Sequence, residues 1–167
     1  MITYEKLSNL VSDGDSDHEL YLLFSKARYL TFRAREKELQ RYRLTPEQAQ
    51  MLFTVKTLNG RTTPTELSRV LLRQPHTVSA LVERMEQKGL VKKFKDLGRK
   101  NLVRVVLTEQ GEKAYEVTAK RGPIHRIMSS LNDMEREYFQ QCLEKIMQKA
   151  RAELGMDRDK LPSSEEY

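Results

Sequence analysis

Apolar residues recur at helical spacing in the first third of the chain. A helix is predicted to begin at Ser16 or Asp17, because Ser16 and Glu19 have the spacing of a capping box. The apolar positions that follow recur every three or four residues: Leu20, Leu23, Phe24, Ala27 and Leu30. The spacing therefore predicts a long amphipathic helix near the N-terminus.

Three shorter helices are predicted in the middle of the chain. Thr45-Pro46 and Thr63-Pro64 each combine a capping residue with a proline at the first helical position. The next helix is predicted over residues 75–88, with Gly89 as its stop. Its apolar stripe consists of Val78, Leu81, Val82 and Met85.

The period of the pattern changes after Gly89. Segments 90–95 and 102–107 are rich in Val, Leu and Phe and flank a loop that contains Gly98, which predicts a β-hairpin. A helix capped by Thr108 follows, and Gly122-Pro123 is expected to kink or break it. The last helix is expected to begin at Asn132. The predicted fold is mainly α with a small β-hairpin, a winged helix-turn-helix flanked by N- and C-terminal helices.

Positive charge is concentrated in the same middle segment. The whole chain of 167 residues has a formal net charge of +6, whereas residues 61–107 alone carry +7 and the remainder sums to −1. A basic block of this kind is typical of a surface that binds phosphate, since neutralised phosphates release condensed counterions. The alternative is a solvated charged face.

The order of elements predicts which residues contact double-stranded DNA. In a winged helix-turn-helix, the second helix of the pair enters the major groove and the hairpin reaches an adjacent minor groove. The candidates on and beside helix 75–88 are Arg73, Gln74, His76, Thr77, Ser79, Ala80 and Arg84, with Arg73 and Arg84 on phosphates. Those on the hairpin are Lys95, Arg99 and Lys100. A polar solvent face and a charged turn are the alternatives.

Several stretches, taken in order, resemble the multiple antibiotic resistance regulator (MarR) family of bacterial transcription factors. They are residues 44–48, 67–71, 77–79, 81–91 and 107–111, within a similarity that covers residues 17–153. The wing departs from the family pattern, with Gly98 where an arginine is usual. The resemblance implies an obligate homodimer that represses or activates transcription from a pseudo-palindromic operator.

The resemblance also implies how the chain is organised. One domain spans 1–167, with a DNA-binding lobe at 44–108, dimerisation helices at 17–43 and 109–155, and loose termini at 1–15 and 156–167. The expected dimer interface includes Leu20, Phe24, Phe139, Leu143 and Ile146, for which a monomeric core is the alternative. The resemblance also implies a pocket for a small aromatic effector, for which Tyr29, Phe32, Met51 and Phe53 are candidates, although ordinary core is the favoured interpretation of these four residues.

The cysteine and histidine content and the absence of known motifs exclude several classes of function. The lone Cys142 excludes an internal disulfide, and its apolar surroundings favour an inert buried thiol over a redox sensor. The three histidines have no metal-ligand spacing, no cofactor motif or catalytic motif is present, and no apolar stretch reaches the about 20 residues of a membrane span. We expect a cytoplasmic, non-enzymatic protein. The alternatives are a winged helix that binds a protein partner and an uncharacterised hydrolase.

Overall fold

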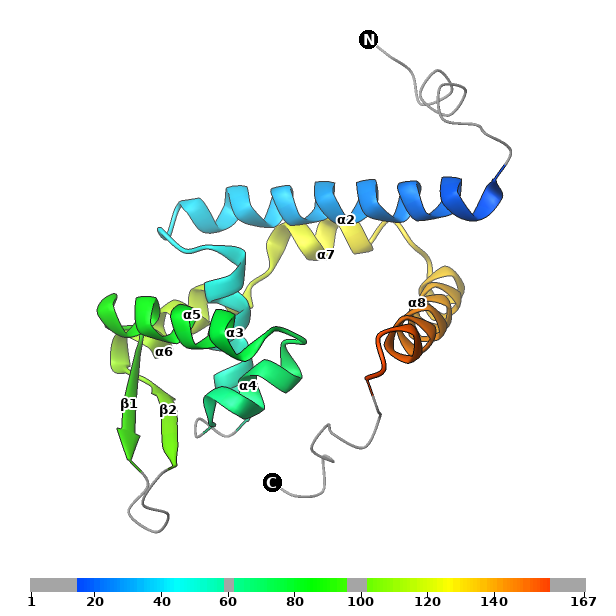
Figure 1. Ribbon diagram of the computed structural model, residues 1–167. Helices are drawn as coiled ribbons and strands as arrows, with labels where there is room; N and C mark the ends of the chain where they lie inside the picture. The colour runs from blue at the N-terminus through cyan, green and yellow to red at the C-terminus, as the bar shows by residue number, and fades with distance from the viewer. Residues whose placement is uncertain (1–14, 59–61, 96–101, 157–167) are drawn as a thin grey trace.

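The computed structural model describes residues 15–58, 62–95 and 102–156 (Figure 1). In chain order its elements are α2 (Ser16–Gln40), α3 (Pro46–Thr57), α4 (Pro64–Val70), α5 (Pro75–Gln87), β1 (Val91–Lys95), β2 (Val103–Leu107), α6 (Glu109–Ala119), α7 (Gly122–Met128) and α8 (Asp133–Glu153). In Figure 1, α7 lies beneath the long α2, the helices from α3 to α6 form a lobe from whose lower edge the hairpin projects, and α8 stands to one side. The fold is therefore mainly α with a winged helix-turn-helix, as the sequence predicts.

Helix α2 begins at Ser16, but its cap differs from the prediction. Asp15, rather than Ser16, is the N-cap, and its carboxylate accepts hydrogen bonds from the N–H groups of Asp17 at 3.0 Å and His18 at 3.2 Å. A carboxylate satisfies two free donors at once and carries the charge that a helix N-terminus favours. The predicted Ser16 capping box is therefore wrong, although the helix start is correct.

Helices α3 and α4 begin with the capping boxes that the sequence predicts. The Thr45 hydroxyl accepts from the Gln48 N–H while the Gln48 side chain accepts from the Thr45 N–H, each at 3.2 Å. Thr63 and Glu66 do the same at the start of α4. Both helices place proline in their first turn, where its missing N–H is not needed.

The hydrophobic core lies inside the lobe. Its buried apolar residues are Leu39, Leu44, Ala49, Met51, Leu52, Val55, Leu67, Leu71, Val78, Leu81, Val82, Met85, Leu90, Val91 and Val105. The set includes all four predicted stripe residues of α5 and the root of the hairpin. Val70, which the spacing places inward, is instead 39% exposed. Because the core fixes one face of α5, it also determines which face remains available to a partner.

The hairpin is antiparallel and is joined to the lobe by an isolated β-bridge. Val91 pairs with Leu107 at its root and Lys95 with Val103 toward its tip. Thr62 forms an isolated bridge with Val105, with backbone N–H···O distances of 3.2 and 2.6 Å. This bridge ties the start of α4 to the wing.

The break predicted at Gly122-Pro123 is confirmed. Helix α6 ends at Ala119, Arg121 adopts a left-handed conformation with φ of 45°, and α7 starts at Gly122. Proline lacks the N–H that would continue the helical ladder, and its ring crowds the preceding turn. The two helices consequently point in different directions.

Helix α8 and the first half of α2 leave large apolar side chains exposed. Helix α8 contributes no buried residue, and Leu20, Phe24, Phe139 and Ile146 are 61%, 38%, 44% and 48% exposed. Leu143 is half-buried. Within the described part of the chain, no helix has the length and apolar character needed to cross a membrane.

Candidate nucleic-acid interface

A tight turn sets the angle between α4 and α5. Leu72 adopts a left-handed conformation with φ of 51°. The Leu72 N–H donates to the Arg69 carbonyl at 3.2 Å, and the Arg73 N–H donates to the Ser68 carbonyl at 3.0 Å. These bonds satisfy the last carbonyls of α4 and turn the chain into α5.

Helix α5 presents a polar face along its N-terminal half. Gln74, His76, Ser79 and Ala80 are exposed and Thr77 is half-buried, while Val78, Leu81, Val82 and Met85 on the opposite face are buried. The spacing of His76, Ser79 and Ala80 places these three on one side of the helix. The fold thus gathers the predicted base-reading residues on one accessible surface.

Basic side chains flank this face. Arg73, Arg84 and Lys88 line a hollow of about 570 Å³ between α5 and the start of α3, together with Thr45, Glu47, Gln48, Thr77, Leu81 and Gln87. Lys88 donates to the Arg43 carbonyl and to Gln48 Oε1, each at 3.2 Å, so this lysine joins α5 to α3. No hydrogen bond or ion pair of the Arg73 or Arg84 side chain occurs with another described residue. These two arginines are therefore available to an external anion.

One lysine of strand β1 in the wing is held by a carboxylate of α5. The Glu86 carboxylate of α5 accepts from the Lys93 N–H at 3.0 Å and pairs with Lys93 Nζ at 2.9 Å. The side-chain hydrogen bond between Glu86 and Lys93 Nζ raises the pKa of Lys93 and lowers that of Glu86. Lys92 and Lys95 are exposed, whereas Arg99 and Lys100 lie outside the described residues. Sequence reasoning missed the role of Lys93, which holds β1 against α5.

A second carboxylate, Glu66, holds the base of the wing. Its Oε2 accepts from the Thr63 N–H at 2.6 Å, the Thr63 hydroxyl at 2.9 Å and the Thr62 hydroxyl at 3.1 Å. Burial raises the pKa of Glu66. These hydrogen bonds and the positive charge of Arg104 together lower it by a larger amount, so the net pKa lies below the ordinary 4.5. Glu66 therefore connects α4 to both the Thr62 bridge and strand β2.

Replacing Glu66 with alanine should lower the free energy of unfolding by about 1–2 kcal/mol at neutral pH, since it removes a helix cap and leaves the buried Thr62 hydroxyl with one acceptor fewer. A lowered folded-state pKa stabilises the fold above the unfolded value of 4.5 and ceases to do so as pH falls through the folded value. In urea denaturation, the free energy of unfolding of the variant should therefore approach that of wild type only below about pH 4.5. The exposed Glu83→Ala is the control, and an equal deficit in that variant would contradict the assignment.

The predicted effector residues do not lie together. Phe32 lines an apolar groove of about 520 Å³ between α2, α7 and α8, whose walls also include Phe24, Arg28, Arg35, Ile127, Phe139 and Leu143. Met51 is fully buried in the core and Tyr29 is 57% exposed. The Phe53 ring lies beneath the Arg121 guanidinium, 4.3 Å from its centroid. Placing all four residues in one pocket was wrong, because α2 and α3 direct them to different surroundings.

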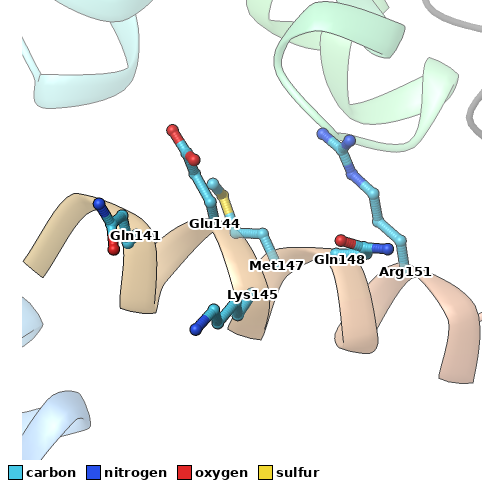
Figure 2. A pocket seen from close by; sticks show the side chains of 6 residues that line it. All are labelled: Gln141, Glu144, Lys145, Met147, Gln148 and Arg151. Carbon is cyan, nitrogen blue, oxygen red and sulfur yellow. The ribbon is translucent and has the colours of Figure 1, made fainter. Parts of the chain in front are cut away.

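A polar hollow of about 510 Å³ lies on α8, and its described lining residues do not form a recognisable binding or catalytic site. Figure 2 shows its six described lining residues, Gln141, Glu144, Lys145, Met147, Gln148 and Arg151, all on one helix, with Lys145 directed away from Glu144 and Arg151. The neighbouring Cys142 is exposed, so its prediction as a buried thiol is wrong for the single chain. Among the described residues, no three His, Cys, Asp or Glu side chains are grouped to hold a metal ion.

Comparisons with known proteins agree with this geometry. Residues 44–106 match the model of the MarR family. The organohalide-sensing transcriptional regulator RdhR, in a 2,4-dichlorophenol-bound form, is 28% identical with a TM-score of 0.71, over 92% of this chain and 86% of its own. AbsC from Streptomyces coelicolor, a MarR family regulator, and a mutant MarR from E. coli complexed with operator DNA are each 20% identical, over 83% of this chain and 96% of theirs, with TM-scores of 0.77 and 0.71. No curated protein sequence matches the chain.

Proposed function

We propose that this chain, whose residues 44–106 match the model of the MarR family, is a DNA-binding transcription regulator of that family and represses transcription as a homodimer on a pseudo-palindromic operator. The observation that carries the proposal is the exposed polar face of α5, flanked by Arg73 and Arg84. A helix with one face fixed by the core and the other free to contact bases is the arrangement that reads a major groove.

The residues divide by the part of DNA that they contact. Gln74, His76, Thr77 and Ser79 read base edges, and Ala80 contacts a thymine methyl group. Arg73 and Arg84 bind phosphates, as does Lys95 of the wing, whereas Arg99 and Lys100 contact the minor groove. Affinity comes mainly from the phosphate contacts and specificity from α5.

Replacing His76 with alanine should change the sequence preference of the protein more than its affinity for phosphate. Loss of one base contact reduces discrimination at one position of each half-site by on the order of 1–3 kcal/mol. Binding measured on operators substituted base by base should locate that position, while the salt dependence stays that of the wild type. An unchanged preference at every position would exclude a base contact by His76.

The homodimer interface is proposed to lie on α2 and α8. Leu20, Phe24, Phe139, Leu143 and Ile146 are exposed or half-buried in the single chain, and burying them against a second copy removes apolar surface from water. A dimer also suits the task, because two recognition helices about one helical turn apart contact two half-sites.

The groove between α2, α7 and α8 is the proposed site of a small aromatic effector. Its walls are mainly apolar, and Arg28 gives it a preference for an acidic group such as a phenolate or carboxylate. The 2,4-dichlorophenol-bound form of the similar regulator RdhR supports an effector of this class. We propose a non-enzymatic role in the bacterial cytoplasm, with regulation through the distance between the two recognition helices.

Selection of bound sequences from random duplex DNA tests the proposal, with the mass of the protein in solution measured alongside. The expected result is a dimer that enriches an inverted repeat with half-site centres about 10 base pairs apart. A dimer that enriches no sequence, and whose weak binding disappears with added salt, would overturn the proposal in favour of a protein-interaction module.

A further inference from the structure

One ion pair of α2 spans the break between α6 and α7. Arg35 and Glu38 pair with each other, and both also reach the broken segment. The Arg35 guanidinium donates to the Thr118 carbonyl near the end of α6 at 2.5 Å, while Glu38 Oε1 accepts from the Gly122 N–H at the start of α7 at 3.1 Å. We call this four-residue arrangement of Arg35, Glu38, Thr118 and Gly122 the joint clamp.

The clamp satisfies groups that the break would otherwise leave free. The last carbonyls of α6 and the first N–H groups of α7 have no partner within their own helices. The arginine also places positive charge at the C-terminal end of α6, where the helix dipole favours it. Both charged side chains are largely buried, at 13% and 18% exposure, so solvent and salt screen them less than surface pairs.

The joint connects two parts of the molecule that have different roles. Helix α6 packs against α3 of the DNA-binding lobe, where Lys56 Nζ pairs with Glu112 at 2.8 Å, whereas α7 packs along α2 (Figure 1). Between them, Arg121 occupies its left-handed conformation with the guanidinium over Phe53 of α3. A change in backbone angle at this joint would therefore move the lobe, and α5 with it, relative to α2.

We propose that Glu38 and Arg35 are positioning residues for DNA binding: the joint clamp fixes the angle between α2 and the lobe and thereby the spacing between the two recognition helices of the dimer. This inference rests on the proposed homodimeric function. It assigns a specific role to two contacts, Arg35 with Thr118 and Glu38 with Gly122, whose residues are 83 and 84 positions apart and lie outside the proposed DNA contacts.

The test compares half-site spacing preferences. Operators whose half-sites are moved one base pair closer or farther should bind wild type much more weakly, whereas Glu38→Ala should discriminate less between spacings. Affinity for the optimal spacing should fall about fivefold, within the range for residues that couple distant sites. Dimer mass and binding to random DNA should stay unchanged, since the clamp lies outside the proposed DNA contacts.

The chain offers a matched control. Glu36 pairs with Arg33 on the same helix with the same three-residue spacing as the clamp pair, and neither side chain forms a hydrogen bond or ion pair with α6 or α7 among the described residues. Glu36→Ala should therefore keep the wild-type spacing preference. If it loses that preference as strongly as Glu38→Ala does, a general effect on α2 replaces the proposal.

A second variant perturbs the clamp from the other side. Arg35→Ala removes the donor to the Thr118 carbonyl and the ion-pair partner of Glu38, so it should relax the spacing preference too. Wild-type spacing preference in both folded variants would overturn the inference. Wild type that selects no operator at all would overturn the proposed function instead, so the two failures are distinguishable.

Discussion

Replacing Phe139 with aspartate should convert the dimer to a monomer and reduce operator affinity by about 100-fold or more. Phe139 is 44% exposed in the single chain and lines the groove between α2, α7 and α8. An aspartate buried there against a second copy would lose its hydration without a partner for its charge. In the dimer, binding of the first half-site holds the second recognition helix close to the other half-site, so the second contact forms at a high effective concentration. A monomer contacts one half-site only and lacks this additional affinity.

The fold itself should survive this substitution, because α8 contributes no residue to the core of the lobe. Light scattering should therefore report half the wild-type mass, with the far-ultraviolet circular dichroism of a folded helical chain. Gln148→Asp introduces the same charge on the polar side of α8 and serves as the control. A Phe139→Asp protein that stays dimeric and binds operator like wild type would place the interface elsewhere.

Local signals predicted the lobe well because its construction is local. The Thr-Pro starts of α3 and α4 and the apolar stripe of α5 each depend on residues a few positions apart. The cap of α2 was misassigned by one residue, since Ser16 and Asp15 are both good caps and only the structure shows which carboxylate or hydroxyl reaches the free N–H groups.

Contacts between distant segments explain what the sequence did not reveal. The joint clamp, the link from Lys88 to Arg43 and the Glu86–Lys93 pair depend on how helices pack, which spacing along one helix does not determine. The same limit affected the effector residues: Met51 and Phe53 are two positions apart on α3 and therefore point to different sides, one into the core and one toward Arg121.

Replacing Arg73 and Arg84 together with alanine should weaken operator binding by the dimer about 1,000-fold near 0.15 M salt and flatten its salt dependence. The dimer carries two copies of each arginine, so if each copy neutralises one phosphate, the slope of log K against log salt should become less negative by about 3.6, from a contribution of about 0.9 per phosphate. The loss in affinity follows from four charge-assisted contacts worth on the order of 1 kcal/mol each. Fluorescence anisotropy with labelled operator at several salt concentrations measures both quantities.

The control must remove the same charge from another surface. Lys113 of α6 and Lys149 of α8 pair with Glu109 and Glu153 on exposed faces, so alanine at both positions lowers the net charge by two without touching α5. Exposed pairs of this kind contribute little to stability, and the control should fold and keep the wild-type slope. If the Arg73 and Arg84 variant also keeps that slope, these arginines do not bind phosphate. The hollow between α5 and α3 would then lie outside the DNA interface, and the cations of the wing would have to supply the affinity.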